Sequence, residues 1–335
     1  MAKIGILGAG GWAIGLAITL NHEGHNVTVW SKIKSELDGI REKGENERSL
    51  PGVSIPKSIE LTDDIRFLAE DNEILVMAVA SPYVRSTAKE LGALGINNLN
   101  IVNVAKGIEE STLMTMTQVI EDEIPDVNVA VLSGPSHAEE VGRFLPTTCV
   151  IGAKNKEFAS HLQDIFMNDV FRIYINPDIL GIELGGSLKN VIALAAGISD
   201  GLGYGDNTKA ALITRGIHEI SRLGVAMGGK IQTFYGLSGI GDLIVTCASI
   251  HSRNRKAGYL IGQGKSMEEA MEEVHMVVEG VYSAKAAYAL SKKYNIEMPI
   301  VEMINKILFE HIPIKDVTSD LMLREPKDEN IDLPW

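Results

Sequence analysis

The chain has 335 residues, a length that suits two domains, and 45% of them are hydrophobic, a composition that excludes intrinsic disorder. Its 31 Lys and Arg against 44 Asp and Glu give a formal charge of −13. A chain this acidic repels nucleic acid and anionic membranes, so neither is expected as a partner, and an anionic ligand needs a local cationic pocket.

The cysteines and histidines exclude two further classes of protein. Cys149 and Cys247 are too few for a disulfide framework, and the eight histidines show no ligand spacing, so no metal is expected. No apolar run reaches the roughly 18 residues of a membrane span, and the N-terminus shows no signal sequence. We therefore expect a cytoplasmic protein without a membrane-inserted segment.

Short β-rich runs alternate with helical stretches through the first half of the chain. Strands are predicted at residues 3–7, 26–30, 74–79, 100–104, 128–132, 148–152 and 171–175. Amphipathic helices are predicted at residues 12–21, 82–91, 113–121 and 156–166. The polar segment 42–63, with its two prolines, is predicted to be irregular with one short strand. Buried strands with helical crossovers predict a doubly wound, mostly parallel sheet.

The pattern changes near residue 180. From residue 182 onward no strand is predicted, and apolar residues recur at helical spacing in segments 188–198, 210–227 and 282–294. Ser266 and Glu269 form a capping box that starts a further helix. The predicted fold class is therefore α/β, with a sheet domain at residues 1–180 and an all-α domain at residues 181–335.

A glycine-rich loop follows the first strand. Gly8, Gly10 and Ala13 form the pattern G-x-G-x-x-A between a strand and a helix. Gly8 allows a tight turn, Gly10 lets the backbone approach a pyrophosphate, and the small Ala13 allows close packing of helix on strand. Glycine-rich turns that bind nothing show the same letters, but the flanking strand and helix favour a dinucleotide site.

The end of the second strand bears on the choice of dinucleotide. An NAD site usually carries Asp or Glu about 20 residues after the glycines, whereas this chain has Ser31 and Lys32 there. A cation without a carboxylate favours the 2′-phosphate of NADPH over NADH. The alternative is that Lys32 is an ordinary solvated lysine.

Two lysines stand in apolar surroundings. Lys106 follows the strand at residues 100–104 and is expected at the carboxyl edge of the sheet, where ligands of such folds bind. Lys189 lies within an apolar helical segment. Burial and a second nearby cation would lower its pKa toward neutrality, as suits a general base. Alternatively its ammonium group snorkels to the surface, and the pattern alone leaves both interpretations open.

Two short polar motifs also suit a ligand. The tetrapeptide at residues 252–255, Ser-Arg-Asn-Arg, combines a hydroxyl, a guanidinium and an amide, a set that fits an anionic, hydroxylated molecule. Ordinary polar loops have similar composition. The turn at residues 133–136 follows a strand and is expected on the ligand-binding edge, although simple turn chemistry also explains it.

Together these motifs resemble the NAD(P)-dependent sn-glycerol-3-phosphate dehydrogenases of the bacterial type. Residues 186–207, from GSLKN to GYGDN, are similar to the family's long signature around its catalytic lysine. Segments 132–140, 239–243, 252–255 and 278–280 fall in the family's order. Two positions depart from the usual pattern, since Ala13 replaces a commoner glycine and Ser187 stands where Ala or Thr is usual.

The resemblance implies a Rossmann-like domain joined to a helical domain, with the site in the cleft between them. It implies that the protein interconverts dihydroxyacetone phosphate and sn-glycerol 3-phosphate with NADPH or NADH, supplies phospholipid synthesis and forms a homodimer. By position, Lys189 would accept the C2 hydroxyl proton as hydride leaves, and Lys106 would polarise the same oxygen and bridge substrate and cofactor.

The resemblance also implies a set of binding residues. Besides the two lysines, those expected around the substrate are Gly134, Ser136, Asp242, Ser252, Arg253 and Asn254. Those expected at the cofactor are Gly8, Gly10, Gly11, Trp12, Lys106, Ala138, Arg253, Val277 and Glu279, with Ser31 and Lys32 as candidates for the adenosine ribose end.

Two other interpretations compete with this one. Phosphogluconate, hydroxyisobutyrate and ketopantoate reductases share such a fold and a catalytic lysine, but they take carboxylate substrates and their lysine motifs do not look like residues 186–207. A non-catalytic sensor of NAD(P)H would bind the cofactor without turnover, but it would need neither Lys189 nor the cluster at residues 252–255.

Overall fold

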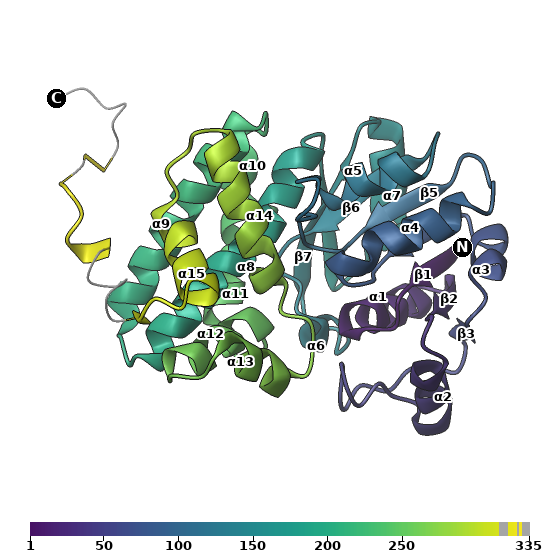
Figure 1. The fold of residues 1–335 in the computed structure, drawn as a ribbon. Helices are drawn as coiled ribbons and strands as arrows, with labels where there is room; N and C mark the ends of the chain where they lie inside the picture. Colours follow the sequence, from purple (N-terminus) through teal and green to yellow (C-terminus); the bar gives the residue numbers. More distant parts are fainter. Residues whose placement is uncertain (315–320, 327, 330–335) are drawn as a thin grey trace.

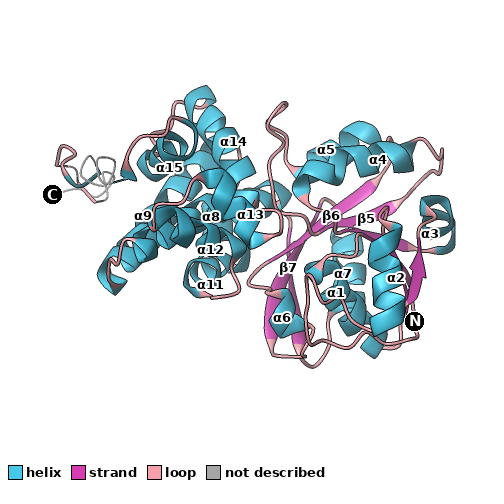
Figure 2. Ribbon diagram, turned by 60° about the horizontal axis from the view of Figure 1, so that its bottom comes forward, coloured by secondary structure: helices cyan, strands magenta, loops and turns pink. Residues whose placement is uncertain are grey.

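The computed structural model describes residues 1–314, 321–326 and 328–329 (Figure 1). Within them, the first part of the chain folds into a sheet with helices on both faces. The second part folds into a group of packed helices beside the sheet (Figures 1 and 2).

Among the described residues, eight strands form one sheet. They are β1 (Lys3–Leu7), β2 (Asn26–Trp30), β3 (Glu60–Thr62), β4 (Ile74–Met77), β5 (Asn100–Asn103), β6 (Asn128–Ser133), β7 (Thr147–Ala153) and β8 (Phe171–Asn176). The spatial order is β3-β2-β1-β4-β5-β6-β7-β8, and every neighbouring pair is parallel except β6 and β7. The predicted mostly parallel sheet is confirmed, and β3 is the short strand expected in the polar segment.

Helices cover both faces of this sheet. They are α1 (Gly11–His22), α2 (Lys34–Lys43), α3 (Ile65–Asp71), the 3₁₀ turn η1 (Ser81–Tyr83), α4 (Val84–Gly92), α5 (Met116–Glu123), α6 (Ala138–Val141) and α7 (Lys156–Phe166). Apolar residues of α1 and α7 form one core with one face of the sheet, and those of α3, α4 and α5 form a second core with the other. The arrangement is therefore a three-layer sandwich that positions the carboxyl ends of the strands.

Two helix predictions for this part need correction at their starts. The helix predicted at residues 113–121 begins at Met116, because Thr115 and Gln118 form a capping box and Leu113 has a φ of 61°, outside the helical region. In the helix predicted at residues 82–91, the first residues form η1, and the regular helix begins only at Val84. In both cases local backbone geometry decides the start, whereas apolar periodicity fixes only the helix body.

From Ile179 onward, the described residues form helices and no strand. The elements are α8 (Ile179–Gly201), α9 (Asp206–Ala226), α10 (Ile231–Phe234), the π-helical turn η2 (Leu237–Gly241), α11 (Asp242–Ala248), α12 (Arg253–Gly262), α13 (Met267–Val274), α14 (Glu279–Lys293) and α15 (Pro299–Phe309). Helix α13 begins with the predicted capping box of Ser266 and Glu269. The predicted helical composition of the second half is confirmed for these residues.

Helix α8 is the centre of the second part. Every residue from Gly181 to Ser199 is buried, and α9, α11, α12 and α14 pack around it (Figure 2). By length and hydropathy it is the one single helix among the described residues that could cross a membrane, and 89% of its apolar window is buried inside the molecule. Packing in the core therefore accounts for its apolar sequence.

Helices α8 and α12 touch through their backbones. The contact uses Gly197 and Gly201 on α8 and Gly258 and Gly262 on α12. A Cβ added at Gly258 would lie 2.2 Å from the carbonyl oxygen of Leu194, too close for any side chain. Glycine at these positions therefore lets the two helices approach more closely than side chains allow, and it places the start of α12 against the middle of α8.

We predict that Gly258→Ala lowers the free energy of unfolding by roughly 1–3 kcal/mol, because the added methyl group overlaps a backbone carbonyl. Gly39→Ala is the matched control. Gly39 lies inside α2, where a Cβ meets nothing within 4 Å, so this change should raise stability by about 0.5–1 kcal/mol. Urea unfolding followed by circular dichroism measures both, and equal effects would contradict the close helix contact.

Candidate active site

The loop after β1 leaves its backbone open at the start of α1. Gly8 has a φ of +117°, and a Cβ there would lie 3.0 Å from the backbone of Ala78, so the turn requires glycine. A Cβ at Gly10 would meet nothing within 4 Å, and Gly10 caps α1 without any side-chain hydrogen bond. The first-turn N–H groups of this helix are therefore available to an anion, and the open cradle fits the pyrophosphate of a dinucleotide.

Other segments close the sides of this loop. A Cβ at Gly11 would lie 2.4 Å from the carbonyl oxygen of Ser49 and 3.6 Å from the Cβ of Ala138. Trp12 is half-buried against Phe171, with ring centroids 6.5 Å apart. The predicted cofactor residues Gly11, Trp12 and Ala138 therefore lie together. The segment around Ser49 lies beside them, and no motif in the sequence had indicated that it would.

Ser31 and Lys32 follow β2 and lie next to two carboxylates. Ser31 is buried, and its Oγ donates to Glu36 at 2.8 Å. Lys32 is exposed, and its Nζ pairs with Glu90 at 2.9 Å. Sequence reasoning considered only the strand end and missed both carboxylates. In the described part of the chain, no hydrogen bond joins Ser31 or Lys32 to the lysines described next.

Lys189, Asp242 and Lys106 form an ion cluster where the sheet meets the helical part. One carboxylate oxygen of Asp242 accepts from Lys189 Nζ at 2.5 Å, and the other accepts from Lys106 Nζ at 2.6 Å. Lys189 Nζ also donates to the hydroxyl of Thr246 at 2.6 Å. The side chains of Lys189 and Asp242 are 6% and 2% exposed, whereas Lys106 is 18% exposed. The ammonium group of Lys189 is therefore buried and does not snorkel to the surface.

Burial sets the ionisation of this cluster. It lowers the pKa of Lys189, the carboxylate of Asp242 opposes the shift, the charge of Lys106 adds to it, and the resulting value is about 8. Burial works to raise the pKa of Asp242, but the charges of the two lysines outweigh it and hold that pKa below its usual value. Asp242 is therefore ionised at neutral pH, while Lys189 exchanges a proton in the range where acid–base catalysts operate.

The loop after β6 lies against Lys106. Lys106 Nζ donates to the carbonyl oxygen of Gly134 at 3.1 Å, and Ser136 Oγ donates to the same oxygen at 2.9 Å. Gly134 has a φ of +144°, and a Cβ there would lie 3.0 Å from the Cα of Cys149. The turn therefore requires glycine, and the structure brings Gly134 and Ser136 directly to one of the two lysines.

Ser252, Arg253 and Asn254 start α12. Ser252 is the N-cap, and its Oγ accepts from the α12 backbone at 3.2 Å. Asn254 is buried, with its Nδ2 donating to Asn190 Oδ1 at 2.9 Å and its Oδ1 accepting from Gly280 N at 2.8 Å. The side chains of Ser252 and Asn254 therefore hold the start of α12 in place against α8 and α14. Arg253 is exposed. Its guanidinium group and the first-turn N–H groups that Ser252 does not cap can meet an anion at this helix start.

Glu279 joins the helical part to the sheet part. At the start of α14, its carboxylate accepts from the backbone N–H of Ser81 at 3.0 Å and from the Ser81 hydroxyl. Burial raises the pKa of Glu279, against these hydrogen bonds and the charge of Arg253. Val277 lies two residues earlier and is half-buried. The predicted cofactor residues Val277, Glu279 and Arg253 therefore belong to one side of the junction.

Glu183 is a buried carboxylate that sequence reasoning missed. It accepts from the Thr117 N–H at 2.9 Å, from the Thr117 hydroxyl at 2.5 Å and from Asn103 Nδ2 at 3.2 Å. Asn103 Oδ1 in turn accepts from the N–H of Ala105, the residue before Lys106. Glu183 therefore ties α8 to the loop that carries Lys106. A signal was available, because a carboxylate inside an apolar helix is rarely buried without partners.

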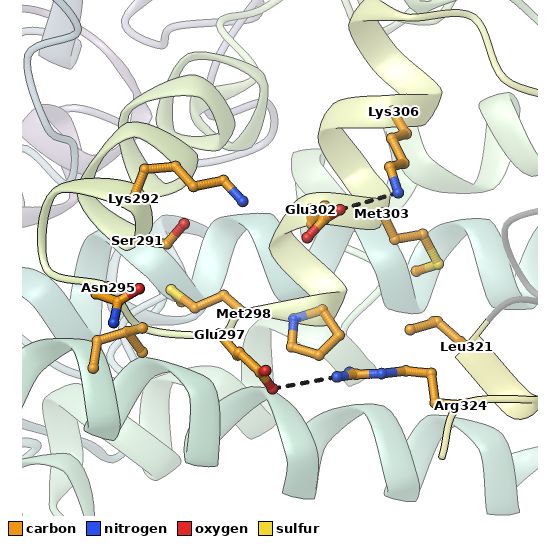
Figure 3. Close-up of a pocket in the computed structure, with 12 residues that line it drawn as sticks. Ser291, Lys292, Asn295, Glu297, Met298, Glu302, Met303, Lys306, Leu321 and Arg324 are labelled. Atoms are coloured by element: carbon orange, nitrogen blue, oxygen red, sulfur yellow. Dashed lines mark hydrogen bonds and ion pairs between the residues drawn. The ribbon is translucent and has the colours of Figure 1, made fainter.

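A separate cavity of about 480 Å³ lies between the end of α14 and the start of α15 (Figure 3). Glu302 pairs with Lys306 at 3.0 Å, and Glu297 pairs with Arg324 at 3.4 Å. None of its lining residues belongs to the ion cluster around Asp242. We therefore do not assign this cavity to the site.

Comparisons with known proteins agree over the length of the chain. The family models described as the N-terminus and the C-terminus of NAD-dependent glycerol-3-phosphate dehydrogenase match residues 3–159 and 178–319. A glycerol-3-phosphate dehydrogenase (NAD(P)+) of Agathobacter rectalis is 59% identical over 335 residues and covers 100% of both chains. One of Fusobacterium nucleatum is 57% identical and covers 98% of this chain and 99% of the relative. The crystal structure of glycerol-3-phosphate dehydrogenase from Coxiella burnetii matches with a TM-score of 0.93 at 36% identity, covering 96% of this chain and 99% of that one.

We predict that Asp242→Asn lowers the free energy of unfolding by about 3 kcal/mol at neutral pH, because two ammonium groups lose their buried counter-charge. The loss should shrink as pH rises from about 6 to about 9, since Lys189 then becomes neutral. Glu90→Gln, which breaks the exposed pair with Lys32, is the control and should change stability by less than about 1 kcal/mol. Urea unfolding at several pH values measures both, and an Asp242→Asn protein as stable as the control would contradict the prediction.

Proposed function

The chain belongs to the NAD-dependent glycerol-3-phosphate dehydrogenase family, and from that premise we propose how its buried ion cluster works. The protein is an NAD(P)-dependent oxidoreductase that interconverts dihydroxyacetone phosphate and sn-glycerol 3-phosphate. One observation carries the proposed mechanism: Lys189 is buried, and the carboxylate of Asp242 binds both its ammonium group and that of Lys106. In this setting the pKa of Lys189 is lowered to about 8.

Lys189 exchanges the proton of the substrate's C2 oxygen. In reduction, its ammonium form donates a proton as the carbonyl becomes a hydroxyl. In oxidation, its neutral amine accepts that proton. A pKa of about 8 keeps both forms populated near neutral pH, which suits a group that must act in both directions. The nicotinamide, when bound, supplies or accepts the hydride at C2.

Lys106 and Asp242 complete the reacting end of the site. Lys106 directs its ammonium group at the C2 oxygen and stabilises the negative charge that develops there. Asp242 is a positioning residue, because its two oxygens hold both ammonium groups in a fixed geometry. The polar hydroxyl of Thr246 holds Lys189 from a second side.

The phosphate group of the substrate lies at the start of α12. This helix has ten residues, and its first-turn N–H groups and the exposed Arg253 offer positive charge. Ser252 and Asn254 hold that turn in place through their framework bonds. Together with the two lysines, these groups form the local cationic pocket that a chain with a charge of −13 needs for an anionic substrate.

The dinucleotide lies along the carboxyl edge of the sheet. Gly8, Gly10 and Gly11 hold its pyrophosphate at the start of α1, where the open backbone supports this assignment. Six further side chains complete the site: Trp12 and Ala138 beside the loop, Val277, Glu279 and Arg253 at the junction, and Lys106 between cofactor and substrate. Ser31 and Lys32 bind the adenosine ribose end, with the cation of Lys32 favouring NADPH.

We also propose the wider setting of the reaction. Residues 1–180 form the dinucleotide-binding domain and residues 181–335 the substrate domain, which is consistent with family models that match residues 3–159 and 178–319. Two free, buried thiols, Cys149 and Cys247, suit the reducing cytoplasm. A homodimer and a role in supplying glycerol phosphate for phospholipids follow from the family resemblance, and analytical ultracentrifugation tests the former.

We predict that Lys189→Ala lowers kcat about 10²–10⁴-fold while NADPH still binds, because the proton has lost its acceptor. In the unmodified protein, kcat/KM for oxidation of glycerol 3-phosphate should rise with pH through an apparent pKa near 8, since only the neutral amine accepts a proton. The absorbance change of NADPH measures turnover, and cofactor fluorescence measures binding.

Lys265→Ala is the control for this prediction, because Lys265 is partly exposed and its ammonium group pairs with Glu273. It should leave both turnover and the pH profile unchanged. Near-normal turnover in Lys189→Ala would remove Lys189 from the mechanism. Cofactor binding without any turnover in the unmodified protein would favour a non-catalytic sensor instead.

We predict a lower KM for NADPH than for NADH. Replacing Lys32 by Glu should reduce this preference for NADPH about two- to fivefold. The expected change is modest because Lys32 is exposed and already paired with Glu90. The preference for NADPH should also weaken at high salt, because salt screens exposed charges. Lys156→Glu, on α7, is the control. Equal KM values for the two cofactors in the unmodified protein would contradict the role of Lys32.

A further inference from the structure

We propose that His137 donates a hydrogen bond from its imidazole ring to the phosphate group of the substrate. The inference rests on the proposed function, because it takes a phosphate monoester as the ligand. It adds a substrate-binding residue on the loop after β6, which already brings Gly134 and Ser136 to Lys106.

The ring of His137 carries a buried nitrogen with no partner. Its Nε2 is shielded from solvent and has no hydrogen-bond partner among the described residues. The backbone of His137 is already held, since its carbonyl oxygen accepts from the N–H groups of Glu140 and Val141 at 3.0 and 3.1 Å. An unsatisfied buried polar group costs about 1–3 kcal/mol. A ligand that bonds to Nε2 would remove this cost.

The ring of His137 lies near the proposed phosphate position. Its ring centroid lies 6.0 Å from that of His251, with an angle of 56° between the rings. His251 directly precedes Ser252, the N-cap of α12. The imidazole of His137, carried by the sheet part, therefore lies beside the residue that leads into α12.

The charges around the ring favour a neutral donor. Burial lowers the pKa of His137, and the charges of Lys189 and Lys106 act in the same direction, against those of Glu139 and Asp242. The ring is therefore neutral near pH 7 and carries a single N–H. Such a group can donate to a phosphate oxygen without placing a third cation beside the two lysines.

Steady-state reduction of dihydroxyacetone phosphate by two variants tests the contact. His137→Phe keeps an aromatic ring opposite His251 and removes both nitrogens, whereas His137→Gln keeps an N–H near the position of Nε2. We expect His137→Phe to raise KM about 10- to 100-fold with a smaller change in kcat. His137→Gln should restore much of the loss. His161→Phe, at an exposed position on α7, is the control and should match the unmodified protein.

Competitive inhibition separates the phosphate contact from other roles of the ring. Inorganic phosphate should bind His137→Phe about 10- to 100-fold more weakly, whereas dihydroxyacetone, which lacks the phosphate, should keep its inhibition constant. An unchanged constant for phosphate, or an equal loss for both inhibitors, would overturn the inference. Failure of the unmodified protein to reduce dihydroxyacetone phosphate would overturn the proposed function and this inference with it, a result that is visible before any variant is made.

Discussion

The carboxylate of Asp242 holds two ammonium groups in a region largely closed to water, and the rest of the site depends on that shared contact. A buried charge is stable only when it is paired in good geometry. The elements that carry Lys189, Asp242 and Lys106 must therefore keep their relative places, although they are α8, the start of α11 and a loop of the sheet part. Two cations and one anion leave an excess of one positive charge, which is the sign that an anionic substrate requires.

The framework around this cluster uses other buried polar groups to keep those elements together. Glu183 joins α8 to the end of β5 and to the start of α5, and Asn254 joins α12 to both α8 and α14. Glu279 joins α14 to η1 in the sheet part. Glu183 and Asn254 are buried and Glu279 is half-buried, and the polar atoms of each bond to backbone or side-chain groups of another element. Helix α8 is the common reference, because it contributes directly to the first two of these contacts and carries Lys189.

Sequence patterns predicted the fold better than the roles of the site residues. Strand alternation, the glycine loop and the capping box at Ser266 are local signals, so they gave the sheet and the helical second half. Lys189 could be singled out because a lysine in an apolar helix is unusual. The bridging role of Asp242 could not, since Lys106 and Asp242 are 136 residues apart and only the folded chain brings them together. Glu90, which pairs with Lys32 from 58 residues away, was missed for the same reason. Glu36 lies in the helix that directly follows Ser31, so its carboxylate could have been considered from the sequence.

The glycine contact between α8 and α12 also limits how the specificity of such a site can be redesigned. The two helices meet backbone to backbone, so their axes are as close as two helices can pack. This contact fixes the separation between Lys189 on α8 and the start of α12. A bulkier residue at this contact would overlap a backbone carbonyl, so the span cannot be adjusted by exchanging one side chain there. A substrate with a longer chain between its carbonyl and its phosphate would therefore require the displacement of an entire helix.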